Sequence, residues 1–223
     1  MSQCMRTTVL HRHRPAAMGD APFLIACTHI SHLEPVIVSC LIDRHVDWMA
    51  RIEFFRHPWA ARMLELVDSF SVNRQGVPIR AIRTSIDRLR AGRVVGIFPE
   101  GGVAREHEGM CNGGPMKAGV CVIAQRARVP VVPVVVLGTE KLNAIDPWLP
   151  MRRGRLWVSF GRPVEPGPPV TRRERRAARR DMAQRLQAEF ARTYRELCAR
   201  CGLSNGHFVA PQMTNDETRM TNQ

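Results

Sequence analysis

Short apolar runs alternate along this chain with segments of helical periodicity, and this alternation limits the folds that it can adopt. Residues 23–27, 94–98 and 129–137 are apolar runs of strand length, whereas residues 79–90 and 171–200 carry apolar side chains at steps of three and four. Strands separated by helices predict an α/β fold with a largely parallel sheet flanked by helices. In such sheets, ligands bind beyond the carboxyl ends of the strands.

Residues 28–35 follow the first apolar run and read Thr-His-Ile-Ser-His-Leu-Glu-Pro. On one continuous helix, His29 and Glu34 would point about 140° apart, because each residue turns the helix by roughly 100°. They can meet if His29 precedes the helix and Glu34 lies in its first turn. Ser31 is a good N-cap, and Pro35 is tolerated in a first turn. The segment is therefore compatible with a histidine–carboxylate pair across a strand-to-helix junction.

Two other interpretations of this segment remain open at this point. Ser31 and Glu34 match a capping box, which alone would explain Glu34, and the segment taken by itself favours this interpretation. His29, His32 and Glu34 are also types of residue that bind metals. Their spacing is not that of a helical His-x-x-x-His pair, and no second cluster of ligands follows, so we expect no metal site.

Polar turns also follow two further strands. Arg74 comes after the short run at residues 70–72, and Glu100 comes after the buried run at residues 94–98. The carboxyl ends of parallel strands meet at one edge of a sheet, so we expect His29, Arg74 and Glu100 to gather there.

These turns, in this order, resemble the motifs of the lysophosphatidate acyltransferase family of glycerolipid acyltransferases. The family's Asn-His, followed by four residues and an Asp, corresponds to residues 28–35, and its arginine after a short strand corresponds to residues 71–74. Its Phe-Pro-Glu-Gly block is present at residues 98–101, and its valine-proline strand is present at residues 129–134. The resemblance changes our preferred interpretation of Glu34 from a cap to the partner of His29, and it implies a fold like that of glycerol-3-phosphate acyltransferase.

The resemblance implies an O-acyltransferase of phospholipid biosynthesis. The donor would be an acyl thioester, either acyl-CoA or acyl carrier protein, and no cofactor is expected beyond this co-substrate. The acceptor would be the hydroxyl of a lysophospholipid, with 1-acylglycerol-3-phosphate as the first choice. His29 would be the catalytic base and Glu34 would orient it. The residues expected to bind substrate are Arg74, Glu100, Gly101, Arg105 and Lys117.

The sequence departs from the family pattern at three places. Glu34 stands where the family usually has Asp, and Thr28 stands where it usually has Asn. Gly102 and Val103 replace the usual Thr-Arg, which leaves Arg105 as the nearest basic residue. These departures keep open a catalytically weak or dead relative that binds lipid or acyl carrier.

The charge of the chain favours an anionic partner. Lys and Arg number 33 against 20 Asp and Glu, which gives a net charge of +13. Such a chain is attracted to nucleic acid or to anionic membranes. A basic nucleic-acid-binding protein is therefore an alternative, but we find no recognised motif for it and expect a membrane surface instead.

The expected location is the cytoplasm, with peripheral binding to the inner face of the membrane. The first twenty residues contain no apolar core of a signal peptide, and no window reaches the roughly 18 apolar residues that a transmembrane helix needs. One interpretation places an aromatic cluster interleaved with arginines on the bilayer, and another places it in the core. This cluster consists of Trp48, Phe54, Phe55 and Trp59.

We expect three regions in the chain. Residues 1–22 form a basic N-terminal arm, either loose or including a short edge strand. Residues 23–202 form the acyltransferase domain. Residues 203–223 are polar, and we predict a disordered tail.

Overall fold

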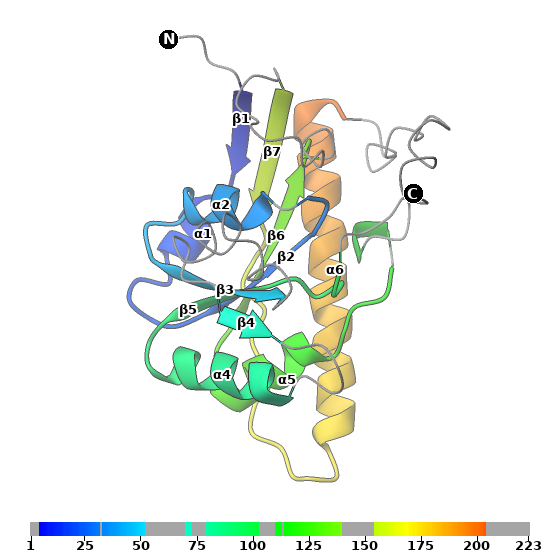
Figure 1. Cartoon of the computed structure of the whole chain (residues 1–223). Coiled ribbons are helices and arrows are strands. Elements are labelled where there is room, and N and C mark those ends of the chain that lie inside the picture. Colours follow the sequence, from blue (N-terminus) through cyan, green and yellow to red (C-terminus); the bar gives the residue numbers. More distant parts are fainter. Residues whose placement is uncertain are drawn as a thin grey trace, which may run out of the picture.

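A seven-stranded sheet lies at the centre of the described structure (Figure 1). The structure is a computed structural model and describes residues 5–31, 33–51, 70–72, 79–102, 110–112, 114–139 and 154–203. The strands are β1 (Met5–Leu10), β2 (Leu24–Cys27), β3 (Val46–Arg51), β4 (Phe70–Val72), β5 (Val94–Ile97), β6 (Val131–Leu137) and β7 (Gly154–Phe160). The helices are α1 (His13–Ala16), α2 (Glu34–Ser39), α4 (Ile79–Arg90), the 3₁₀ helix η2 (Met110–Asn112), α5 (Gly119–Ala127) and α6 (Arg175–Cys201).

The sheet is mostly parallel, as the sequence predicts. Its strand order is β1-β7-β6-β2-β5-β3-β4. The last five strands in this order run parallel to one another, whereas β7 runs antiparallel to β6. β1 pairs in parallel with β7, from Met5 opposite Gly154 to Leu10 opposite Ser159. The N-terminal segment therefore contributes an edge strand, which is one of the two alternatives expected for residues 1–22.

The central strands are apolar throughout because helices cover both faces of the sheet. Every residue of β2, β5 and β6 is buried. Side chains alternate along a strand, so Leu24 and Ala26 face a core formed with α4, α5 and α6. Ile25 and Cys27 face the other core, which includes Val38 of α2. Figure 1 shows the same arrangement, with α1 and α2 apart from α4, α5 and α6.

Helix α6 runs along one side of the sheet (Figure 1). Before its first turn, the N–H and hydroxyl of Thr171 both donate to the Glu174 carboxylate, at 2.9 and 2.7 Å. The apolar stripe expected on this helix is buried, and it consists of Met182, Leu186, Phe190, Tyr194 and Leu197. Each helix in the described part of the chain, α6 included, is too short or too polar to cross a membrane.

Helix α4 packs most of its expected apolar stripe against the core, but not the first residue of that stripe. Its buried residues are Ala81, Ser85 and Leu89, whereas Ile79 remains 51% exposed. Ile82 and Ile86 are partly buried and pack against the same core, so the small side chains of Ala81 and Ser85 share the contact with them. The spacing predicted the helix and most of its packed face, but not the exposure of Ile79.

The interpretation of Trp48 as a membrane-facing residue is wrong. The Trp48 side chain is 1% exposed, and a Cβ atom at Gly96 would lie 2.5 Å from its indole ring. Only glycine leaves room for the indole at this point of β5. The other three aromatic residues of the expected cluster lie outside the described residues, and they are Phe54, Phe55 and Trp59.

Candidate active site

The turn between β2 and α2 holds the predicted histidine and carboxylate. His29 follows β2 directly, and α2 begins at Glu34 with Pro35 in its first turn. The N–H and hydroxyl of Ser31 both donate to Glu34 Oε1, at 2.8 and 2.9 Å. Ser31 Oγ in turn accepts the Leu33 N–H at 3.1 Å. The side chain of Glu34 therefore reaches back over the start of the helix, as in a capping box.

The second oxygen of Glu34 contacts the histidine. Glu34 Oε2 lies 3.2 Å from His29 Nδ1, and the Glu34 side chain is completely buried. The expected contact between His29 and Glu34 is therefore present, while the other oxygen of Glu34 binds Ser31. The expectation that Ser31 is the N-cap is wrong, because Leu33 is the N-cap of α2 and no side chain caps this helix. A carboxylate that faces Nδ1 favours the tautomer with the proton on Nδ1, which leaves the lone pair on Nε2.

Stacked aromatic rings hold the imidazole in place. The His29 and Phe98 ring centroids lie 4.0 Å apart with an interplanar angle of 21°. Phe98 stacks in turn on Trp48, at 5.2 Å and 20°. The His29 side chain is 14% exposed, so the ring is packed but still reaches the surface. The stack restricts the ring to one orientation, in which Nδ1 meets Glu34.

Thr139 completes the surroundings of Glu34, although the sequence did not single it out. This buried residue lies just beyond β6, and its hydroxyl donates to Glu34 Oε1 at 2.7 Å. Gly138, before it, has a φ of +88°, and a Cβ there would lie 2.1 Å from the Arg155 carbonyl oxygen. The sequence did contain a signal for Thr139, since a polar residue that closely follows an apolar strand is expected at the same edge of the sheet as His29.

Glu100 lies at the same edge and orders the backbone of the site. Its Oε2 accepts the His29 N–H at 3.0 Å, and its Oε1 accepts the Met110 N–H at 3.0 Å. Burial raises the pKa of Glu100, and these two hydrogen bonds offset part of the rise. The side chain thus ties the turn after β2 to the segment at η2.

Gly101 and Lys117 lie beside this turn. Gly101 has a φ of +80°, and a Cβ at this position would overlap the side chain of Lys117. The Lys117 N–H donates to the Pro99 carbonyl oxygen at 2.9 Å, and the Lys117 side chain is exposed. The structure therefore gathers five predicted site residues at one edge: His29, Glu34, Glu100, Gly101 and Lys117. Arg74 and Arg105 lie outside the described residues.

The cysteine before the turn is not suited to act as a nucleophile. Cys27 is buried directly before the turn, and burial, followed by the nearby carboxylates of Glu34 and Glu100, raises its pKa well above the usual range. A thiol that keeps its proton is a poor nucleophile, so this turn offers an imidazole paired with a carboxylate and no reactive thiol. In the described ranges, no three His, Cys, Asp or Glu side chains gather closely enough to hold a metal ion.

Comparisons with known proteins agree on one family. The sequence model of the family described as Acyltransferase matches residues 7–137. A 1-acyl-sn-glycerol-3-phosphate acyltransferase of Bacillus subtilis is 29% identical over 147 residues, which cover 66% of this chain and 68% of that relative. A probable 1-acyl-sn-glycerol-3-phosphate acyltransferase of Mycoplasma pneumoniae is 23% identical over 167 residues, with coverages of 68% and 60%.

A solved structure shows the same fold. The crystal structure of the 1-acyl-sn-glycerophosphate acyltransferase PlsC from Thermotoga maritima superposes with a TM-score of 0.59 at 20% identity. The match covers 85% of this chain and 73% of that one. The mostly parallel sheet flanked by helices is therefore shared with an acyltransferase structure.

Proposed function

The chain belongs to the acyltransferase family, and from this premise we propose that it moves a fatty acyl group from an acyl thioester to the hydroxyl of 1-acylglycerol-3-phosphate. The observation that carries the proposal is the contact between His29 Nδ1 and the buried Glu34 carboxylate, at the edge where α/β sheets bind ligands. The relatives from Bacillus subtilis and Mycoplasma pneumoniae, both named for this acceptor, support its choice.

The reaction needs a base but no covalent intermediate on the protein, because a thioester is already activated. His29 Nε2 takes the proton of the acceptor hydroxyl while the hydroxyl oxygen attacks the thioester carbonyl carbon. The tetrahedral intermediate then collapses, the carbon–sulfur bond breaks, and the imidazolium returns its proton to the leaving thiolate. Glu34 stabilises the imidazolium, as the acid of a Ser-His-Asp triad does.

The departure from aspartate at residue 34 is compatible with an active enzyme. The longer side chain of Glu34 reaches back from the first residue of α2, and its Oε2 still lies 3.2 Å from His29 Nδ1. The buried hydrogen bonds to Oε1 fix this conformation. Activity is thus favoured over the alternative of a dead relative that only binds lipid or acyl carrier.

The remaining predicted residues form the binding site in this proposal. Arg74 holds the acceptor phosphate with its guanidinium fork, and Arg105 and Lys117 supply further positive charge for phosphate groups. Glu100 and Gly101 shape the floor of the acceptor site. The hydrogen bond from the His29 N–H to Glu100 supports this role, because it couples the acceptor floor to the catalytic turn.

The protein works from the surface of an anionic membrane in this proposal. Its net charge of +13 supports attraction to anionic lipid at the inner face of the membrane, where lysophospholipid acceptors reside. The donor is acyl-CoA or acyl carrier protein, and no further cofactor takes part.

The test measures thiol release and product formation together. The purified full chain is incubated with palmitoyl-CoA and either 1-acylglycerol-3-phosphate or the matched acceptor without phosphate, 1-acylglycerol. We expect equimolar thiol and phosphatidate with the first acceptor, and a rate at least about ten-fold lower with the second, because the charged hydrogen bonds to the phosphate are lost. Thiol release that ignores the acceptor would indicate a thioesterase and contradict the proposal.

A further inference from the structure

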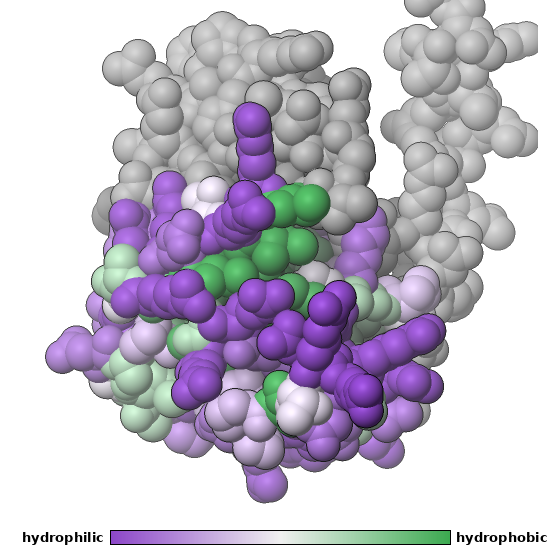
Figure 2. Space-filling view, turned by 90° about the horizontal axis from the view of Figure 1, so that it is seen from below, coloured by the Kyte–Doolittle hydropathy of each residue, from purple (hydrophilic) through white to green (hydrophobic). Residues whose placement is uncertain are grey.

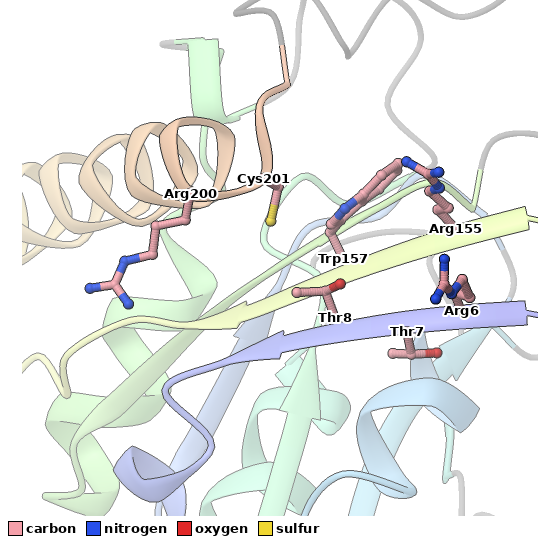
Figure 3. Close-up of a pocket in the computed structure, with 7 residues that line it drawn as sticks. All are labelled: Arg6, Thr7, Thr8, Arg155, Trp157, Arg200 and Cys201. Atoms are coloured by element: carbon pink, nitrogen blue, oxygen red, sulfur yellow. The ribbon is translucent and has the colours of Figure 1, made fainter.

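A basic cavity lies at the catalytic edge of the sheet, apart from the dyad. It has a volume of about 780 Å³ and lies between β1, β7 and the end of α6 (Figure 3). Figure 3 shows Arg6 and Thr8 on β1, Arg155 and Trp157 on β7, and Arg200 and Cys201 at the end of α6. A cavity of this size suits a ligand as large as a nucleotide.

Two arginines of this cavity are placed side by side. Arg6 and Arg155 are direct register partners on the neighbouring strands β1 and β7. Both side chains are exposed, and neither forms an ion pair with a carboxylate in the described parts of the chain. Like charges directly opposite each other in a sheet are destabilising. A bound phosphate would remove this repulsion, because guanidinium forks bind phosphate oxygens in pairs.

The third arginine adds to the positive charge from the other side of the cavity. Arg200 belongs to the last turn of α6, and its Nη2 lies 3.3 Å from Glu196 Oε1. The side chain is 59% exposed, so a second anionic group can still contact it. The hydroxyl of Thr8 and the indole of Trp157 supply polar and apolar surface between the arginines.

The cavity and the catalytic dyad lie on opposite faces of the sheet, on either side of the end of β6. Trp157 and Cys201 pack against the core that includes α6, whereas Phe98, which stacks on His29, packs against the core that includes α2. Thr139, which donates to Glu34, directly follows Gly138. Gly138 lies against Arg155 and Trp157, since a Cβ there would lie 2.1 Å from the Arg155 carbonyl oxygen and 3.1 Å from the Trp157 ring. β7 and β1 are the second and third strands from β2, so the cavity lies roughly 10–14 Å from the turn that carries His29 when measured along the sheet.

We propose that this cavity binds the phosphorylated nucleotide end of acyl-CoA, and that it thereby selects the free coenzyme as the acyl donor. The pantetheine arm of CoA has about as many backbone bonds as four peptide residues and extends over roughly 13–14 Å. An arm of this length covers the distance along the sheet when the phosphates lie between Arg6 and Arg155, and it bends over the carboxyl edge of the sheet to bring the thioester to His29. The inference rests on the proposed function, because it requires the thioester to react at His29.

The decisive variant is Arg6→Gln/Arg155→Gln, which removes the two guanidinium groups that lie side by side. Its matched control is Arg126→Gln/Arg179→Gln, which makes the same change of charge in a separate arginine-lined cavity of about 480 Å³. That cavity lies at the other end of the molecule, where α6 begins, and Figure 2 shows this end to be mostly hydrophilic. Comparing the two double variants separates local binding from the loss of net charge.

Two measurements are made on the full chain. Calorimetry measures the affinity for coenzyme A and for dephospho-coenzyme A, and steady-state kinetics compares palmitoyl-CoA with palmitoyl-pantetheine, which lacks the nucleotide. We expect Arg6→Gln/Arg155→Gln to weaken coenzyme A binding and raise KM for palmitoyl-CoA by about ten-fold or more, because charged hydrogen bonds to phosphate are lost. KM for palmitoyl-pantetheine should not rise, and the control should match the parent with both donors.

Several results would overturn the inference. The inference fails if the parent does not bind coenzyme A, or if the two double variants lose the same amount of coenzyme A affinity. It also fails if Arg6→Gln/Arg155→Gln raises KM for both palmitoyl-CoA and palmitoyl-pantetheine. Weaker binding to phosphatidylglycerol vesicles with unchanged coenzyme A affinity would assign the arginines to the membrane, and a KM increase with acyl carrier protein alone would assign them to the carrier. If no donor supports transfer, the proposed function fails, but calorimetry still decides whether the cavity binds coenzyme A.

Discussion

The two edges of the sheet each bury a carboxylate, and they stabilise it in different ways. At the carboxyl edge, Glu34 accepts hydrogen bonds from Ser31 and Thr139, and its remaining partner is the imidazole of His29. At the opposite edge, Asp47 at the start of β3 is equally buried but forms ion pairs with the guanidinium groups of Arg88 and Arg93.

Asp47 has charged partners and Glu34 has mostly neutral ones, and this difference affects what each carboxylate can do. Two guanidinium groups compensate the buried charge of Asp47, so removing either side of this pairing should destabilise the fold. The two hydroxyl groups and the N–H that bind Glu34 are neutral, so its charge remains available to stabilise the imidazolium of His29 in the proposed mechanism. The comparison predicts that substitutions at the carboxyl edge reduce activity and that substitutions at the opposite edge reduce stability.

The largest effect is expected from Glu34→Gln. The amide can accept the hydrogen bonds of Ser31 and Thr139 only if its NH₂ group faces His29 Nδ1, which forces the proton onto Nε2. In this tautomer Nε2 cannot act as a base, and kcat should fall by about 10³-fold. Thiol-release kinetics measures the loss, and a kcat close to that of the parent would show that the tautomer does not limit the reaction.

Asp47→Asn tests the opposite edge. Removing the charge leaves Arg88 and Arg93 without their buried partner, and the free energy of unfolding should fall by about 3 kcal/mol. Urea unfolding measures this change, while kcat of the folded variant should equal that of the parent. A loss of kcat without a loss of stability would remove the distinction between the two edges.

Thr139→Val tests a single neutral donor to Glu34. The variant keeps the branched shape but loses the hydroxyl that donates to Oε1 at 2.7 Å. A lost hydrogen bond to a charged group costs roughly 1.5 kcal/mol, so kcat/KM should fall by about ten-fold. Thr139→Ser keeps the hydroxyl and should restore most of the activity. A Ser variant as slow as the Val variant would assign Thr139 to packing alone.

The smallest effect is expected at Glu189, a more exposed carboxylate that also forms an ion pair with an arginine. Burial alone would raise the pKa of Glu189, but hydrogen bonds from the Arg192 guanidinium and the Arg162 N–H outweigh it, and the pKa is lowered. A lowered pKa contributes stability above the ordinary value of 4.5, and this contribution disappears as the pH falls. Glu189→Gln should therefore cost up to about 1 kcal/mol at pH 7.

The pH dependence of this difference is the measurement. Urea unfolding of the parent and of Glu189→Gln should give free energies that converge as the pH falls below 4.5. A difference that stays constant across this range would mean that packing, and not the charge of Glu189, stabilises the helix.

The sequence predicted the parts of the site that depend on local order. The turn at residues 28–35 contains both members of the dyad. Because His29 and Glu34 are five residues apart and would diverge on one helix, their contact already required a strand-to-helix junction. Thr139 was missed because its contact with Glu34 joins residues 105 positions apart. Hydrophobic periodicity carries no information about such a contact.

The parts of the fold that the sequence did not predict also depend on contacts between residues far apart in the chain. The alternation of strands and helices predicted a largely parallel sheet, but the antiparallel pairing of β7 and the position of β1 depend on contacts between distant strands. The sequence alone leaves Trp48 open between membrane and core, because its burial depends on Gly96 of the neighbouring strand β5.

The most direct test of the account is the rate of thiol release with palmitoyl-CoA and 1-acylglycerol-3-phosphate in the parent and in His29→Ala. The account predicts that the variant keeps the unfolding midpoint of a folded protein while its kcat falls by about 10³-fold or more, because the base is gone. A His29→Ala variant that stays folded and transfers the acyl group at the parent rate would contradict the assignment of His29 as the catalytic base.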